Sequence, residues 1–334
     1  MNPKTAPEEP VHYMIGGGIA SLAAATLLLR EGAAAGRQIR ILEDMAVVGG
    51  SLDGSGDPDS GYLVRGGRMF EPHFVCTLDL LDRIPSIDDP GRSVRDDIVA
   101  FNEAVPGSSS CRLVRDGGCA PDRYDLTLRP GDIVDLNRLL LTGERRLGAR
   151  RIDEWFGDSF LESNFWIMWA TMFSFQPWHS LVELRRYLRR FIHLFPGFTR
   201  IAGILRTRYN QYDSIVLPLR NWLSGQGVQF ITGTRVTDIS IDGDLSSRRV
   251  TGLVVDGGQD IPVRPGDRVY ITLGSMTDAS QTGSEDVAPP LHDAEGPAWR
   301  LWRRLAERHE GFGTPEAFCG DPARTAWNSF TVTL

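Results

Sequence analysis

Hydrophobic and polar positions near the start of the chain predict a strand, a tight turn, a helix and a second strand. The stretch 11–15 reads as a short strand and leads into three consecutive glycines at 16–18. Apolar residues then recur at helical spacing over 23–32. A second apolar run, 39–42, ends at the acidic residue Glu43. This order of elements is typical of a Rossmann-like α/β fold.

The glycine turn and Glu43 together form a fingerprint for an adenine dinucleotide, although a glycine-rich turn alone is often only a turn. Gly16 permits the tight turn, and Gly18 lets the backbone approach a pyrophosphate held by the first amides of the helix. Ser21 stands where a third glycine is usual and is small enough to keep the helix close to the strand. The Glu43 carboxylate would accept hydrogen bonds from the adenosine ribose. We therefore expect Gly16, Gly18, Ala20, Ser21 and Glu43 to bind the cofactor.

Two further glycine clusters favour a flavin over a nicotinamide. Gly49-Gly50-Ser51 and Arg65-Gly66-Gly67-Arg68 follow Glu43, and paired glycines suit a backbone that wraps a bulky ligand. A surface loop is the alternative, because 53–61 is rich in Gly, Asp, Ser and Pro. A strand pattern at 268–275 then resembles the element by which flavoproteins return to the nucleotide domain. The expected cofactor is FAD, with further contacts from Gly50, Ser51, Arg65, Gly67, Arg68, Gly274 and Ser275.

The patterns divide the chain into three blocks. Residues 11–75 form the first part of the predicted FAD-binding domain, and 76–220 are mostly helical, where a substrate domain would be inserted. Residues 221–334 are β-rich and return to the FAD-binding domain. The strands expected in this last block are 227–231, 249–255 and 268–275. The predicted fold is therefore α/β: a Rossmann-like FAD-binding domain, an inserted helical domain and a β-rich return segment.

Composition and charge exclude some classes of function. A chain of 334 residues, 41% of them hydrophobic, is long enough for two domains. A net charge of −7 provides no basic footprint for nucleic acid. The four cysteines show no CxxC pair and no grouping with histidine, so we expect no metal site.

The sequence also bears on location and completeness. It contains no apolar run of membrane-spanning length, and the polar, proline-rich stretch 1–10 does not resemble a signal peptide, so we expect a cytoplasmic protein. Residues 328–334 alternate as a strand does and stop without a turn or cap. A terminal strand paired in a sheet is one interpretation. We favour a chain cut short before a C-terminal region that completes the sheet.

Three polar or aromatic segments are candidates for chemistry. The aromatic stretch 164–180 would fill a core, or line a wall for a hydrocarbon chain, since burial yields about 0.8 kcal/mol per methylene. On the next helix, 181–191, Tyr187 lies on the apolar face. It would pack its ring there, or donate a proton into an apolar pocket. The polar stretch 208–214 is either a turn before a helix or strand, or the place from which Gln211 or Asn210 reaches a buried polar group of a ligand.

Together these segments resemble the oleate hydratases, flavoproteins once called myosin-cross-reactive antigens. The matching stretches are 16–25, 65–68, 71–74, 173–180, 186–188, 209–212 and 273–277. The resemblance implies that water is added to the cis double bond of a free unsaturated fatty acid, giving 10-hydroxystearate from oleate, with FAD required and no net redox change. It implies that Tyr187 donates the proton and that Gln211 lies near the substrate. We expect Phe175 and Trp178, from the aromatic stretch, to contact the substrate as well.

The chain departs from the family pattern at one position. The family's water-activating glutamate directly follows Gly-Gly-Arg, and this chain has Met69 there. A thioether cannot accept a proton from water. We favour Glu71 as the substitute; the alternatives are that backbone and flavin groups order the water, or that activity is low.

Two other classes of function stay open. A flavin-dependent oxidoreductase of the amine-oxidase or desaturase type would have much the same nucleotide domain. A flavoprotein fragment or fatty-acid binder without turnover is the other alternative. The sequence leaves open the oligomeric state and any peripheral contact with a membrane.

Overall fold

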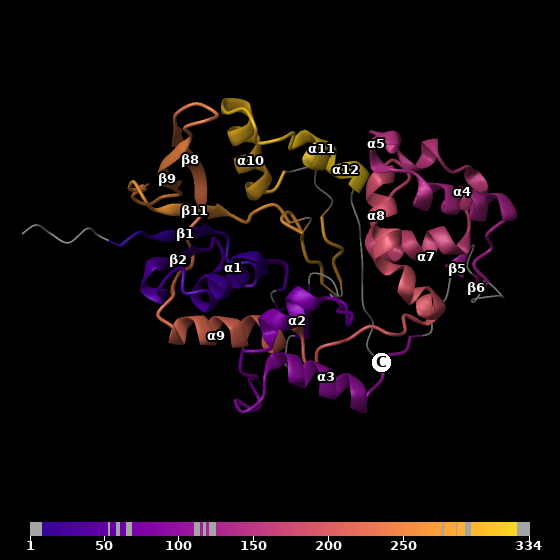
Figure 1. Ribbon diagram of the computed structural model, residues 1–334, viewed down its shortest axis with the longest axis horizontal. Coiled ribbons are helices and arrows are strands. Elements are labelled where there is room, and N and C mark those ends of the chain that lie inside the picture. The colour runs from indigo at the N-terminus through magenta and orange to yellow at the C-terminus, as the bar shows by residue number, and fades with distance from the viewer. Residues whose placement is uncertain are drawn as a thin grey trace, which may run out of the picture. The chain divides into compact units, whose positions relative to one another are not determined.

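The strands predicted around the glycine turn belong to one parallel sheet (Figure 1). In the computed structural model, this sheet consists of β1 (His12–Ile15), β2 (Ile39–Leu42), β7 (Gln229–Ile231) and β11 (Arg268–Ile271). Their order is β11-β1-β2-β7, and every neighbouring pair is parallel. The strand expected at 268–275 ends at Ile271 and pairs with β1, so its predicted return to the domain of the glycine turn is confirmed.

The structure describes residues 9–52, 54–57, 61–64, 69–109, 114–115, 118–119, 125–275, 277–284, 286–290 and 295–325. Two units form within the chain. The split unit comprises Met1–Ala104 and Leu205–Leu334, and the inserted unit comprises Val105–Ile204. The predicted terminal strand at 328–334 lies outside the described residues.

The split unit also contains helices and short antiparallel strands. Its helices are α1 (Ile19–Arg30), α2 (Val75–Leu81), α3 (Val94–Ala104), α9 (Leu217–Gly225), α10 (Pro297–Arg308), α11 (Glu316–Cys319) and α12 (Pro322–Thr325). Its other strands are β3 (Gly54–Asp57), β4 (Gly61–Val64), β8 (Val236–Asp242), β9 (Arg249–Val255) and β10 (Ile261–Pro262). Strands β10, β9 and β8 form an antiparallel sheet in that order, and β3 pairs with β4. The strand predicted at 249–255 is confirmed with its bounds.

The two faces of the parallel sheet meet different cores. Met14 of β1 belongs to a cluster with Leu22 of α1, and the neighbouring residue Tyr13 belongs to a second cluster with Leu253 of β9 and Leu301 of α10. All four residues of β1 are buried, because helices cover one face and the antiparallel sheet covers the other. Figure 1 shows α1 and α9 on one side of the sheet, and β8, β9 and α10 on the other.

The inserted unit is mostly helical, as predicted. Its helices are α4 (Pro130–Leu141), α5 (Glu144–Leu147), α6 (Asp158–Leu161), α7 (Asn164–Phe173) and α8 (Leu181–Phe191), and its strands are β5 (Val114–Arg115) and β6 (Gly118–Cys119). Phe160, Phe165 and Trp169 are fully buried at its centre. Much of the aromatic stretch 164–180 therefore fills a hydrophobic core, which was one of its two predicted roles.

The boundaries of the inserted unit differ from the predicted block 76–220. Helices α2 and α3 lie in the split unit, because Leu81 and Ile98 pack in the same core as Leu22 of α1. The residues from 205 onward return to that core through Leu219. Whether the inserted unit is a substrate domain stays a prediction.

Candidate functional site

The predicted turn after β1 has the geometry that only glycine tolerates. Gly16 has φ +96°, and a Cβ built there would lie 2.7 Å from Leu273 Cδ2. Gly50 has φ +57°, and a Cβ there would lie 3.0 Å from the Gly18 Cα. Gly18 itself has φ −73° and forms a parallel bridge with Gly49. Two glycine-rich backbones thus touch at the carboxyl end of the sheet, and the binding of a cofactor by Gly16, Gly18 and Gly50 stays a prediction.

The amino end of α1 lies at this turn with the features of an anion site. Gly18 is its N-cap, with no side-chain cap, and the first turn of α1 contains no acidic residue. The amides of this turn and the positive end of the helix dipole are therefore available to an anion. Ala20 is exposed on the same turn, and Ser51 follows the facing glycine pair at 49–50.

Ser21 has a structural role that the sequence did not reveal. It is fully buried, and its hydroxyl lies 2.9 Å from the hydroxyl of Thr272, at the end of β11. Thr272 in turn donates to the Ile15 carbonyl at 3.0 Å. This link fastens the start of α1 to β11, so a serine in place of the usual third glycine is compatible with close packing.

Glu43 lies beside the turn, at the end of β2. It is 8% exposed, and its carboxylate accepts hydrogen bonds from the amides of Gly17, at 2.6 Å, and Met45, at 2.9 Å. A Cβ on Gly17 would lie 2.9 Å from Glu43 Oε2. The middle glycine of the three is therefore also required, and the run of three glycines in the sequence was the available signal. The role of Glu43 toward a ribose stays a prediction.

Gly274 and Ser275 follow β11 at the same end of the sheet. Gly274 has φ +108°, and its neighbour Leu273 accepts a hydrogen bond from Trp302 Nε1 at 2.9 Å. The Ser275 hydroxyl lies 2.8 Å from that of Thr277. The predicted contacts Arg65, Gly67 and Arg68 lie outside the described residues.

The segment that carries Met69 and Glu71 is pinned by backbone bonds in the split unit. Phe70 and Leu205 exchange hydrogen bonds of 3.0 and 2.7 Å in an antiparallel bridge. Met69 is 50% exposed, whereas Glu71 is 2% exposed. Glu71 Oε2 accepts from the amide of His73 at 2.9 Å and lies 2.8 Å from His73 Nδ1. A buried carboxylate with an imidazole beside it is a group capable of proton transfer. The i, i+2 spacing of Glu71 and His73 was the only sequence signal for this contact.

Gln211 is buried in the split unit immediately before a π-helix, Tyr212–Val216. Asn210, next to it, donates to Asp213 at 2.7 Å and accepts from the Asp213 amide at 2.8 Å. The π-helix continues into α9, so residues 208–210 lie immediately before a helix, as the turn interpretation predicted. Single π-turns occur frequently at functional sites.

Tyr187 lies on α8 of the inserted unit among phenylalanine rings. Its ring is edge-on to Phe173 at 5.3 Å and to Phe175 at 5.2 Å, and 6.0 Å from Phe191. The side chain is 37% exposed. It is thus held by apolar packing and still reachable. Phe175, expected to contact substrate, is buried and packs against Tyr187, while Trp178 lies edge-on to His179 at 6.2 Å.

Two features position Tyr187. Ser174, the C-cap of α7, has φ +56°, a left-handed conformation that turns the chain and brings Phe175 against Tyr187. Arg185 on α8 is buried and donates to the Leu139 and Leu140 carbonyls at 3.2 and 3.3 Å, at the end of α4. Neither feature has a pattern in the sequence that would have predicted it.

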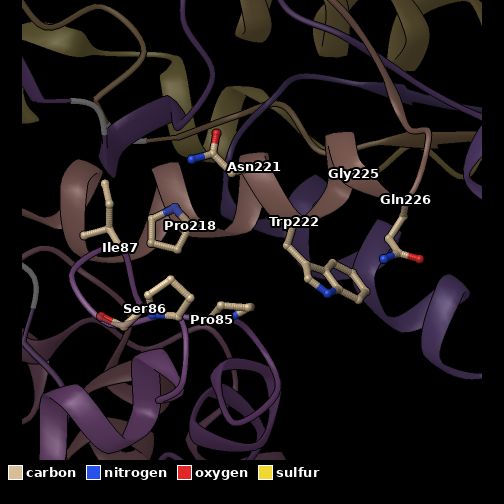
Figure 2. Close-up of a pocket in the computed structure, with 9 residues that line it drawn as sticks. Pro85, Ser86, Ile87, Pro218, Asn221, Trp222, Gly225 and Gln226 are labelled. Carbon is tan, nitrogen blue, oxygen red and sulfur yellow. The ribbon is translucent and has the colours of Figure 1, made fainter.

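A cavity of about 360 Å³ in the split unit contains none of the predicted site residues. Figure 2 shows Pro218 and Trp222 projecting from α9 on the side of Pro85 and Ser86. Its lining consists of proline, tryptophan, isoleucine, glycine and uncharged polar residues, without a titratable side chain. This cavity offers no group for acid–base chemistry.

The fold and the turn define a class: a Rossmann-like α/β protein with a helical insertion and a glycine-rich site at the carboxyl ends of its strands. More particularly, the chain belongs to the MCRA family, whose family model matches residues 10–334.

Two curated relatives agree with this membership. The chain is 39% identical over 330 residues to an oleate hydratase of Streptococcus pyogenes serotype M49 (strain NZ131), covering 96% of this chain and 55% of that protein. It is 34% identical over 349 residues to a linoleate hydratase of Lactiplantibacillus plantarum, covering 96% of this chain and 61% of that protein. The chain therefore spans between half and two thirds of the length of these relatives.

A solved structure supports the fold. A CLA-producing fatty acid isomerase from P. acnes has a TM-score of 0.51 and 17% identity, and the match covers 80% of this chain and 60% of that chain. At this identity the likeness concerns the fold alone. Among the helices that the structure describes, none combines the length and the apolar character needed to cross a membrane.

Proposed function

We propose that this chain carries the FAD-binding and proton-donating parts of a fatty acid hydratase. The reaction adds water to the cis double bond of a free unsaturated fatty acid and converts oleate to 10-hydroxystearate without net redox change. The observation that carries the proposal is the 39% identity to an oleate hydratase over 96% of this chain. The second hydratase among the relatives supports the same reaction class.

The residues of the split unit fit FAD. Gly18 and Gly50 present bare backbone at the uncapped start of α1, which suits a pyrophosphate, and Glu43 is the acceptor for the adenosine ribose. Gly274 and Ser275 complete the same end of the sheet. When bound, FAD would supply polar ring groups beside developing positive charge.

Hydration balances without an oxidant or reductant. The π electron pair of the alkene takes a proton and forms a C–H bond at one carbon. A lone pair of water then forms a C–O bond at the other carbon, and the extra proton on that oxygen passes to a base. One water is consumed in total, and the base then returns its proton to the donor by way of solvent, which restores both groups; no electrons are exchanged.

Tyr187 is the proposed proton donor. Its phenol carries an O–H group that can donate a proton, and the rings of Phe173 and Phe175 hold it in an apolar setting. Because its side chain is 37% exposed, a ligand can reach it.

Glu71 is the proposed base, because Met69 cannot accept a proton. Glu71 Oε2 accepts a hydrogen bond from the His73 amide and lies 2.8 Å from His73 Nδ1, an imidazole that can relay a proton. Burial at 2% exposure keeps the carboxylate in a setting of low dielectric, where its interaction with a water or a cation is strong.

The test is the product formed from oleate by the FAD-loaded protein in H₂¹⁸O. We expect a hydroxy acid with ¹⁸O in the hydroxyl group and no change in the absorbance of oxidised flavin. Tyr187→Phe should lower turnover about 100-fold or more, the scale of a lost general acid, with flavin content unchanged. Tyr13→Phe is the matched control, because the hydroxyl of Tyr13 makes a single long contact, 3.5 Å with Arg40, among the described residues.

Other outcomes would overturn the proposal. Bleaching of the flavin by the fatty acid would favour an oxidoreductase. Bound oleate without product would indicate a binding protein. Full turnover in Tyr187→Phe would remove this tyrosine from the reaction.

A further inference from the structure

Three arginines converge on a second cavity, at the opposite end of the parallel sheet from the glycine turn. This cavity of about 330 Å³ is lined by Arg248, Arg249, Val250, Asp267, Arg268, Val269 and Tyr270. Arg249 begins β9 and Arg268 begins β11, whose first pair is with His12 at the start of β1. Since the glycine turn follows the last residue of β1, the two sites occupy opposite ends of the strands. Figure 1 shows β9 on the side of the parallel sheet away from α1.

The three guanidinium groups have no counter-charge of their own. In the part of the chain that the structure describes, none of them makes a hydrogen bond or an ion pair. Other arginines of the same unit do form ion pairs or hydrogen bonds through their guanidinium groups: Arg235, Arg264, Arg303, Arg304 and Arg308. This cavity therefore gathers three unpaired positive charges, although the net charge of the whole chain is −7.

The one carboxylate in the lining is already committed. The Asp267 side chain is 1% exposed. It accepts from the amides of Val11, at 2.8 Å, and Arg264, at 2.9 Å, and from two Arg264 guanidinium nitrogens at 3.2 Å. Arg264 balances its charge, so Asp267 does not neutralise the cavity arginines.

Arg248 is oriented by stacking rather than by an acid. Its guanidinium carbon lies 5.0 Å above the Phe312 ring. Its Nε is buried and has no hydrogen-bond partner. Stacking fixes the plane of a guanidinium and leaves its edge N–H groups directed outward, which is the arrangement used for planar recognition of anions.

We propose that this cavity binds a phosphate monoester group, carried by a small solute or by a lipid headgroup. Arginine forks match two oxygens of a phosphate, and three of them suit a dianion better than a singly charged carboxylate. A volume of about 330 Å³ is at the lower end of small-molecule sites, which run from about 300 to 1,000 Å³. The apolar lining is limited to Val250, Val269 and the ring of Tyr270, too little to cover an acyl chain, so the fatty acid substrate is not the expected occupant.

The experiment measures the affinity of the FAD-loaded protein for inorganic phosphate by calorimetry, with ionic strength held constant by chloride. We expect saturable binding at one site per chain. Arg249→Gln combined with Arg268→Gln should weaken it at least 10-fold. The matched control combines Arg83→Gln with Arg220→Gln, two exposed residues of the same unit that give the same change in net charge. This control should keep wild-type affinity.

Two further arms identify the source of the phosphate. Co-sedimentation with vesicles of phosphatidylcholine containing phosphatidic acid, lost in the cavity variant and kept in the control, would identify a lipid headgroup. Competition by glycerol 3-phosphate without vesicle binding would identify a small solute. Both cavity arginines are exposed, so the variant should fold, and its unfolding temperature checks this.

Three results would overturn the proposal. Phosphate could show no saturable binding above the chloride background. The cavity and control variants could weaken binding equally, which would indicate non-specific attraction. Oleate could displace phosphate, which would make the cavity a carboxylate site.

Discussion

Replacing Gly18 by alanine should separate the binding of FAD from the stability of the fold. Gly18 has φ −73°, which alanine adopts freely, and its Cβ would meet only the Gly50 Cα at 3.8 Å. Alanine is a poorer N-cap than glycine, but it also reduces the entropy of the unfolded chain by about 0.4–1 kcal/mol, so the two effects offset. The unfolding temperature of the FAD-free protein should therefore change by no more than about 4 °C.

The added methyl group of Gly18→Ala should instead weaken the binding of FAD. A methyl group forced into a filled contact typically costs about 1–3 kcal/mol. That energy corresponds to FAD affinity weakened roughly 5- to 150-fold. The assay strips the flavin, titrates it back while following its fluorescence, and measures unfolding of the FAD-free protein by scanning fluorimetry.

Gly16→Ala is the contrasting variant. Gly16 has φ +96°, and its Cβ would lie 2.7 Å from Leu273 Cδ2, so alanine strains the fold itself. About 1–3 kcal/mol should be lost in the FAD-free protein. If Gly18→Ala kept wild-type affinity, the pyrophosphate would not lie at this turn. If Gly18→Ala lowered the unfolding temperature as much as Gly16→Ala does, the backbone angle and the free space at Gly18 would not be what allows alanine there.

Further predictions address the proposed base, a strained residue and a buried histidine. Met69→Glu, which restores the family residue, should raise turnover with oleate, whereas Glu71→Gln should abolish it with flavin content unchanged; turnover in Glu71→Gln at the wild-type rate would exclude Glu71 as the base. Ser174→Val should destabilise the protein by about 1–3 kcal/mol, because a β-branched residue resists φ +56°, and Ser174→Gly should not; equal unfolding temperatures would contradict this. Burial lowers the pKa of His12 below 6.5, and the charge of Arg268 lowers it further. Below pH 6.5 the unfolded chain therefore takes up a proton that the folded protein does not, and stability falls with pH by at most about 1.4 kcal/mol per unit; urea unfolding of His12→Gln should show a shallower loss between about pH 5 and 6.5.

The first βαβ unit could be predicted from the sequence because its signals are local. The glycines at 16–18 require their turn wherever the rest of the chain lies, and the apolar periods on either side specify strand and helix. The return of β11 to the parallel sheet was predictable only by analogy with flavoproteins, because the sequence of residues 268–271 does not specify which strand they pair with.

The boundaries of the inserted unit were not predictable in this way. An amphipathic helix such as α3 shows an apolar face without showing which core that face joins. Ile98 packs with Leu22, from a segment far earlier in the chain, and only tertiary structure reveals it. The same holds for the pairing of Ser21 with Thr272.

Features of the candidate site that depend on backbone detail were also missed. The π-helix after Gln211 and the left-handed Ser174 arise from tertiary packing that overrides local preference. The roles of Tyr187, Glu71 and Gln211 came from family resemblance and remain predictions. The residues themselves showed only a tyrosine among apolar neighbours and a carboxylate two positions from a histidine.

The pairing of β1 with β11 has a consequence for how the protein is made. His12 pairs with Arg268, so the ribosome adds more than 200 residues after β1 before its partner strand exists. At about 5–20 residues per second this leaves an unpaired edge of β1 exposed for some tens of seconds. The residues of the inserted unit are complete well before that point, and its helical, local contacts favour early folding. The β11 side of the parallel sheet is thus completed late, and until then only β2 and α1 are in place to cover β1.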